Sequence, residues 1–186
     1  PDMARFLVCL LCYQSGVFAA IALAAIYAQE AIGFTAEDNI KLFFVVNGTA
    51  AVGAFAFGYV QDRLGHVRTI ALTLAGWLLM TAIALGSDSR GQFWVAANIA
   101  GLCLGSSQSA SRALVGFFAP VQRRAEFFGL WGLAMKLAAI AGPMTYGLTT
   151  WLSGGNHRLA LGITGLYFVG GLLLLIGIDA RRGRAA

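Results

Sequence analysis

The chain has 186 residues, of which 59% are hydrophobic and 11% charged, and its formal net charge is +5. Soluble domains have roughly 25% charged residues, so this chain has too little polar surface to cover its apolar residues in water. The composition therefore excludes a soluble globular domain and indicates a membrane protein with apolar helices against lipid.

Six apolar segments follow one another, and each reaches the roughly 20 residues that a helix needs to cross the hydrocarbon core of a bilayer. They lie at residues 4–29, 39–61, 67–87, 92–117, 124–152 and 158–179. The sequence therefore predicts an all-α polytopic membrane protein, with one six-helix transmembrane domain over residues 1–186. No basic region or cleavage site precedes the first segment, so we expect a spanning helix there rather than a signal peptide. The opening residue is Pro1 rather than Met, so we expect the native chain to be longer.

The first segment carries the polar run Tyr13-Gln14-Ser15. Polar side chains are costly in hydrocarbon, so this run is expected to point into the helix bundle or into a water-filled cavity. Cys9 and Cys12 form a CxxC pattern in the same segment. Inside a membrane helix we interpret them as small packing residues rather than as a redox or metal site.

The second segment carries Asn47 and a stripe of small residues at helical spacing, Ala50, Ala54 and Gly58. Small residues let two helix backbones approach closely, so such a stripe alone indicates a packing seam. Where the stripe also carries an amide or a cation, we favour a transport pathway. Asn47 is therefore a candidate pathway residue.

The third and sixth segments differ from the other four, because no ionisable or amide side chain lies within their apolar cores. Polar groups of the other segments are expected to face the bundle or a wet cavity. The pattern predicts two three-helix repeats, each with two polar helices and one helix that faces lipid.

The fourth segment carries a polar stripe at steps of three or four residues, which are Asn98, Gly101, Gly105, Gln108 and Arg112. Gln108 is the candidate pathway residue of this stripe. Because Arg112 and Glu126 lie near the same mouth of the predicted bundle, we expect them to form an interhelical ion pair at a gate.

An intramembrane serine protease is a weaker alternative that this segment raises. Gly105-Ser106-Ser107 resembles part of the protease pattern, but Gln108 stands where those enzymes need glycine. His66 and His157 lie in a loop and at a helix entrance, so no base is expected at the depth of the serines.

The fifth segment places Lys136 midway along an apolar run, on a stripe of small residues that comprises Gly129, Gly132, Ala139 and Pro143. Glu126 is about 15 Å away along the helix axis and cannot pair with it. Lys136 either holds helices together by donating to backbone carbonyls or to an amide such as that of Gln108, or contacts a lipid headgroup, or faces the central cavity. We favour the cavity, where the ammonium would meet a substrate carboxylate or an acid from another part of the protein.

Basic residues concentrate on one side of the predicted domain. That side has Arg5, Arg63, Arg68, Arg123, Arg124, Arg181, Arg182 and Arg184, whereas the other has Lys41, Arg90 and Arg158 among acidic residues that include Asp88. By the positive-inside rule, both ends of the chain are expected to be cytoplasmic. The net charge reflects this bias and not a face that binds nucleic acid.

The loop after the second segment reads GYVQDRLGHVR over residues 58–68. Its G-x-x-x-D-R-x-G pattern resembles the signature loop of the major facilitator superfamily, although His66 and Val67 stand where that family has two adjacent basic residues. We expect a cytoplasmic gate loop formed by Gly58, Asp62, Arg63, Gly65 and Arg68, in which the carboxylate pairs with the arginines or with a helix N-terminus.

A longer stretch, residues 107–147, is similar to the fourth-to-fifth helix region in the C-terminal half of the autophagy-related vacuolar effluxers and their bacterial relatives. The matching elements are Gln108, Ser111-Arg112, Pro120, the run from Ala125 to Gly129, Lys136 and Gly142-Pro143. Family members often have an acidic residue where Ser15 stands here, which implies that this chain lacks that carboxylate or couples differently. The resemblance implies half of a twelve-helix facilitator fold, helices seven to twelve.

We therefore expect the C-terminal half of a secondary active transporter, which moves a small solute by alternating access about a site near the bilayer midplane. The pathway candidates are Gln14, Asn47, Gln108 and Lys136. The resemblance implies amino acids as candidate solutes, moved outward from their compartment. A six-helix scaffold that binds a partner is the alternative, but it would need neither the loop pattern nor the division into polar and apolar helices.

The expected partners are the N-terminal six-helix half of the same chain, a small-molecule substrate with or without a proton, and the lipid bilayer. No cofactor, metal or nucleic acid is expected. The expected location is a bacterial inner membrane, or a vacuolar membrane if the source is eukaryotic.

Overall fold

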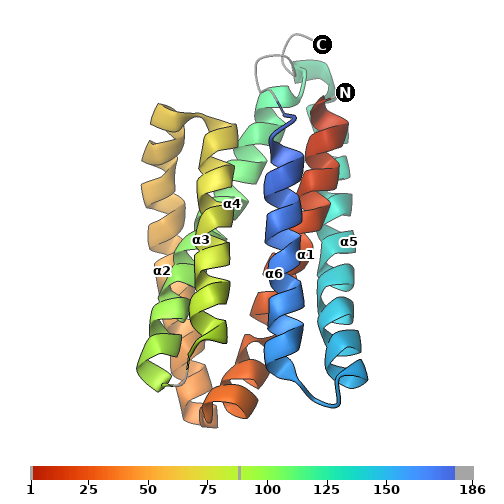
Figure 1. Cartoon of the computed structure of the whole chain (residues 1–186). Coiled ribbons are helices and arrows are strands. Elements are labelled where there is room, and N and C mark those ends of the chain that lie inside the picture. The colour runs from red at the N-terminus through yellow and green to blue at the C-terminus, as the bar shows by residue number, and fades with distance from the viewer. Residues whose placement is uncertain (1, 88, 179–186) are drawn as a thin grey trace.

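The computed structural model describes residues 2–87 and 89–178, which form a bundle of long antiparallel helices (Figure 1). The helices are α1 (Asp2–Ile32), α2 (Ala36–Leu64), α3 (His66–Leu85), α4 (Arg90–Phe118), α5 (Arg124–Leu152) and α6 (His157–Leu175), and a 3-10 turn, η1 (Val121–Arg123), precedes α5. The predicted all-α fold is confirmed. The end of the last predicted segment, Asp88 and the arginines at 181, 182 and 184 lie outside the described residues.

Successive helices run in opposite directions, so the start of α1 and the end of α6 lie at the same end of the bundle (Figure 1). We call this the terminal end, and it also holds the α2–α3 turn and η1. The opposite end, which holds the α1–α2, α3–α4 and α5–α6 connections, is called the far end.

Among the described residues, five helical stretches are long and apolar enough to cross a membrane. They are α1, α2, α3, α6 and the combined stretch Val121–Leu152. The exception is α4, which has 29 residues but carries most of the polar side chains of the bundle. Ser106, Ser107 and Ser111 are completely buried there, so the polar side of α4 faces neighbouring helices rather than the outside.

The two three-helix repeats exchange their first helices. α1 packs mainly on α5 and α6, α4 packs mainly on α2 and α3, and α3 contacts α6. The contacts keep their pattern when α1 is swapped with α4, α2 with α5 and α3 with α6. The paired helices are also similar in length, with 31, 29 and 20 residues in the first repeat and 29, 29 and 19 in the second. Because α1 and α4 run in opposite directions, this is the inverted-repeat arrangement that transporter folds use.

Glycines bring the exchanged helices into backbone contact. A Cβ at Gly105 of α4 would collide with the backbone of Ala50 and Ala54 on α2, and one at Gly142 of α5 would collide with the backbone of Ser15 on α1. The predicted packing seam is therefore confirmed for the small residues of α2 and α4.

The outer faces of α2 and α5 are the most exposed in the bundle. Only Leu42 and Gly53 are buried in α2, whereas α3 and α6 have eight and seven buried residues. The two helices that were expected to face lipid thus pack on each other more closely than expected, and α2 and α5 present the widest surfaces for lipid or for the rest of the protein.

Candidate transport pathway

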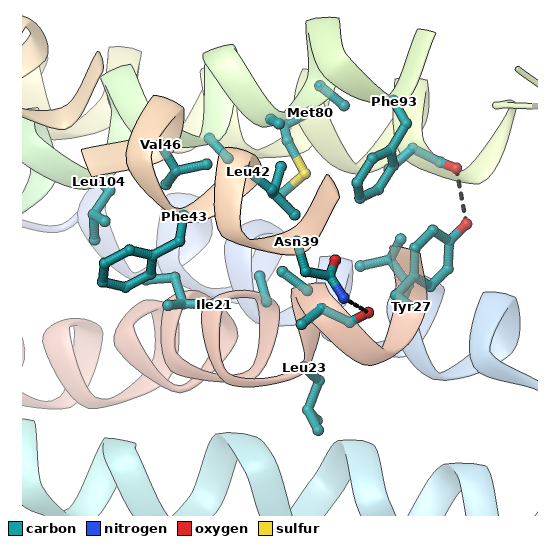
Figure 2. A pocket seen from close by; sticks show the side chains of 18 of the residues that line it. Ile21, Leu23, Tyr27, Asn39, Leu42, Phe43, Val46, Met80, Phe93 and Leu104 are labelled. Carbon is teal, nitrogen blue, oxygen red and sulfur yellow. Dashed lines mark hydrogen bonds between the residues drawn. The ribbon is translucent and has the colours of Figure 1, made fainter. Parts of the chain in front are cut away.

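A pocket of about 230 Å³ opens at the far end, where α1 and α2 diverge (Figure 2). Side chains of α1, α2, α3 and α4 form most of its wall, and Tyr146 of α5 and Leu161 of α6 complete it. Of the four pathway candidates, only Asn47 lines this pocket. Its side chain is anchored, because Nδ2 donates a hydrogen bond of 2.8 Å to the carbonyl oxygen of Phe43 on the same helix.

Gln14 lies inside the bundle, where its side chain is completely buried. Neither its Nε2 nor its Oε1 has a hydrogen-bond partner among the described residues, and the same holds for the hydroxyl of the adjacent Tyr13. An unpaired buried polar group costs roughly 1–3 kcal/mol, so these atoms indicate another state in which water, solute or a second part of the protein reaches them.

Gln108 is half-buried on α4, and its backbone oxygen accepts a hydrogen bond from the Ser111 hydroxyl. The other serines of this stretch also donate to their own helix, with Ser106 bonded to Leu102 and Ser107 to Leu104. The ring of His157 pairs instead with Tyr146. No serine–histidine pair is therefore present in the described part of the chain, and the geometry gives no support to a protease.

Lys136 is exposed on α5, and its ammonium makes neither a hydrogen bond nor an ion pair with any residue that the structure describes. The expected donation to Gln108 or to a backbone carbonyl is not present. A Cβ at Gly129 or Gly132 would meet no atom within 4 Å, so the whole small-residue stripe around Lys136 is open.

Asn47 and Lys136 occupy equivalent places in the two repeats. Each stands six residues before a glycine that packs on the first helix of the other repeat, Gly53 on Leu102 and Gly142 on Ser15. The structure therefore does not gather the four candidates into one cluster. It places Asn47 toward the far end, Lys136 toward the terminal end, and Gln14 in the bundle interior.

The expected ion pair between Arg112 and Glu126 is wrong. Glu126 Oε2 lies 2.6 Å from Nη2 of Arg123, three residues earlier in the chain. The guanidinium of Arg112 lies 5.2 Å from the centre of the Trp131 ring. A cation over an aromatic face is a favourable contact, so α4 and α5 are joined here by Arg112 and Trp131 instead.

The gate loop forms a tight turn but no internal ion pair. Gly65 has a φ of 82°, which favours glycine, and it ends α2 directly before α3 begins. Gln61 Nε2 lies 2.6 Å from His66 Nδ1 in a hydrogen bond across the turn. The predicted pairing of Asp62 with Arg63 or Arg68 is wrong for this part of the protein, because all three are exposed and none forms a salt bridge within residues 2–87 and 89–178.

The sequence analysis missed a clamp at the far end. Arg90, at the start of α4, pairs with Asp38 at 3.2 Å, donates to the carbonyl oxygen of Gly33 and lies 5.8 Å from the centre of the Phe34 ring. Thr35 and Asp38 form a capping box at the start of α2. The Thr-x-x-Asp spacing is a signal for this helix start, and it was available in the sequence.

Two exchanged three-helix repeats and an open helix face with an unpaired lysine are features of the class of membrane transport proteins with inverted repeats. The whole chain, residues 1–186, matches the family described as Vacuole effluxer Atg22 like, and it belongs to that family.

Individual relatives are named as transporters and not as enzymes. The chain is 22% identical over 169 residues to the uncharacterized MFS-type transporter YxiO of Bacillus subtilis (strain 168), with 91% of this chain and 39% of the relative covered. It is 27% identical over 138 residues to autophagy-related protein 22 of Candida glabrata, covering 68% of this chain and 26% of that protein. It is 29% identical over 153 residues to the 3-(3-hydroxy-phenyl)propionate transporter of Escherichia coli (strain K12), covering 82% and 38%. The chain thus spans less than half the length of each of these relatives, and it is an integral membrane protein of the MFS type.

Proposed function

We propose that this chain is the C-terminal six-helix half of a secondary active transporter that moves a small solute by alternating access. The observation that carries the proposal is Lys136, a cation within a membrane helix on a face that nothing in the described chain covers. An ionisable residue at this depth is costly and is typical of a solute or ion pathway.

The inverted repeats support the mechanism, because in such folds two bundles rock about a site near the midplane. Asn47 and Lys136, at equivalent positions of the two repeats, would lie on opposite sides of that midplane. The N-terminal half of the protein would cover the exposed faces of α2 and α5, and an acidic residue of that half or a solute carboxylate would pair with Lys136.

The proposed solute carries a carboxylate, since a lysine in a desolvated site forms a strong charge-assisted hydrogen bond with one. Amino acids satisfy this condition, and so does the aromatic acid in the name of the E. coli relative. The proposed location is a bacterial inner membrane, or a vacuolar membrane in a eukaryote, with the terminal end in the cytoplasm because it has the larger share of arginines.

Transport by the full-length protein in proteoliposomes tests this proposal. Lys136→Met should abolish solute uptake or uncouple it from its driving gradient, while the amount of inserted protein stays the same. Lys41→Met is the matched control, because Lys41 is exposed and pairs with Glu37 at 2.7 Å near the far end. Normal transport by Lys136→Met would refute the role of this residue and leave the scaffold as the better interpretation.

A further inference from the structure

We propose that the far-end pocket is a subsite for an uncharged aromatic ring of the transported solute. This inference rests on the proposed function, and it adds a chemical class of solute and a place within the bundle where part of that solute binds.

The size of the pocket fits one ring with a short substituent. Its volume is about 230 Å³. An apolar cavity of about 150 Å³ in another protein is large enough to bind benzene. The far-end pocket therefore has room for a six-membered ring and a few further atoms, but it is too small for most drug-sized molecules.

The lining chemistry excludes a charged occupant. Aromatic and sulfur-containing side chains such as Trp77, Met80 and Phe93 form part of the wall, and no Asp, Glu, Lys, Arg or His lines the pocket. Burying a charge beside such a wall without a partner is strongly unfavourable. Aromatic rings and methionine sulfur, by contrast, make favourable contacts with a bound ring.

The pocket is held open by small residues and by anchored walls. Seven of its lining residues are alanines, so space exists where a leucine would fill it. Tyr27 donates a 2.8 Å hydrogen bond to the carbonyl oxygen of Ala84, as Figure 2 shows. Trp77 stacks on Phe168 with ring centres 5.3 Å apart. Because these walls are fixed by their own contacts, a ring enters a space that is already formed.

Binding to the full-length purified protein tests the inference directly. The probes are 3-phenylpropionate and its ringless analogue propionate, measured by equilibrium dialysis. Burial of a phenyl ring should make 3-phenylpropionate bind roughly ten- to a hundred-fold more tightly than propionate. Equal affinity for the two probes would overturn the proposal.

A pair of alanine variants locates the ring. Ala24 is half-buried and lines the pocket, so Ala24→Leu should remove most of the preference for 3-phenylpropionate. Ala22→Leu is the matched control, because Ala22 is exposed on the same helix and does not line the pocket. If Ala24→Leu does not fold, Ala100→Leu fills the pocket from α4 instead. An unchanged preference in a folded pocket variant would overturn the proposal, as would a lipid chain that occupies the pocket and is not displaced by 3-phenylpropionate.

Failure of this inference is distinguishable from failure of the proposed function. Transport of a solute without any preference for a ring would refute only the subsite. Ring binding that depends on Ala24 in a protein that transports no solute would refute only the transport function.

Discussion

The small-residue stripes of α4 and α5 are similar in sequence but lie in opposite environments. Gly101 and Gly105 of α4 contact the backbone of α2 and leave no room for a Cβ, whereas Gly129 and Gly132 of α5 have no neighbour within 4 Å of such an atom. The spacing of glycines therefore does not distinguish a packing seam from an open face. The difference lies in what covers the stripe, and the open stripe is the one that carries Lys136.

The same contrast extends to the polar residues of the two helices. Serines of α4 satisfy their hydroxyls within their own helix and are buried. Lys136 of α5 has no such local partner among the described residues, and a lysine side chain cannot pair with its own helix backbone as a serine does. A cation on an open face therefore indicates a function that the packed stripe does not have.

The largest expected effect comes from adding a side chain to each stripe. Gly105→Leu would force the backbones of α2 and α4 apart, so we expect a loss of about 1–3 kcal/mol or more and a low yield of folded protein. Gly132→Leu should change stability by less than about 0.5 kcal/mol. Thermal unfolding of the full-length protein in detergent measures both variants. Equal destabilisation would mean that another helix packs tightly on the α5 stripe, which contradicts a pathway there.

Removal of the buried amide should have a smaller effect and the opposite sign. Gln14→Leu replaces an unpaired polar group with an apolar one of similar size, so the protein should become more stable by about 1–3 kcal/mol. Transport should nevertheless fall, because Gln14 is a pathway candidate. Gln29→Leu, at an exposed position of the same helix, is the control for both measurements. A lower unfolding temperature for Gln14→Leu would show that the amide has structural partners after all.

The smallest effect is expected at a cation whose partner is visible. Arg90 and Asp38 have exposed side-chain fractions of 55% and 23%, so the clamp that they form at the far end is partly screened by water. Arg90→Met should cost no more than about 1 kcal/mol, and high salt should reduce the difference from the wild type. A much larger loss of stability, or abolished transport at normal stability, would mean that Arg90 belongs to the pathway as Lys136 does.

Much of the fold was predictable, because the length and hydropathy of a segment are local properties of the sequence. The segment at 39–61 corresponds to α2 (Ala36–Leu64), and the glycine at 65 marks the turn that ends it. The exchange of α1 and α4 between the repeats was not predicted from the residues. It depends on which seams fit together, and the sequence does not encode that choice in any short pattern.

The candidate site was predicted less well, because partners are chosen by distance in three dimensions. Glu126 pairs with Arg123 on the adjacent turn instead of with Arg112, which lies over Trp131. The pocket was missed because it is formed by what alanines leave empty, and an alanine in a membrane helix gives no signal of a cavity. Lys136 was recognisable because an isolated cation in an apolar run is conspicuous in any sequence.

The most direct test of the account asks whether Lys136 faces water or lipid in the full-length protein. Lys136→Cys and Leu137→Cys would be made in a background without Cys9, Cys12 and Cys103, and treated in membrane vesicles with a thiol reagent that does not cross the bilayer. Leu137 is 47% exposed and lies about 100° further around α5, so it is the matched control. Our account predicts that Lys136→Cys is modified and Leu137→Cys is not. An unreactive cysteine at position 136, or equal reaction at both positions, would contradict a water-filled pathway along this face of α5.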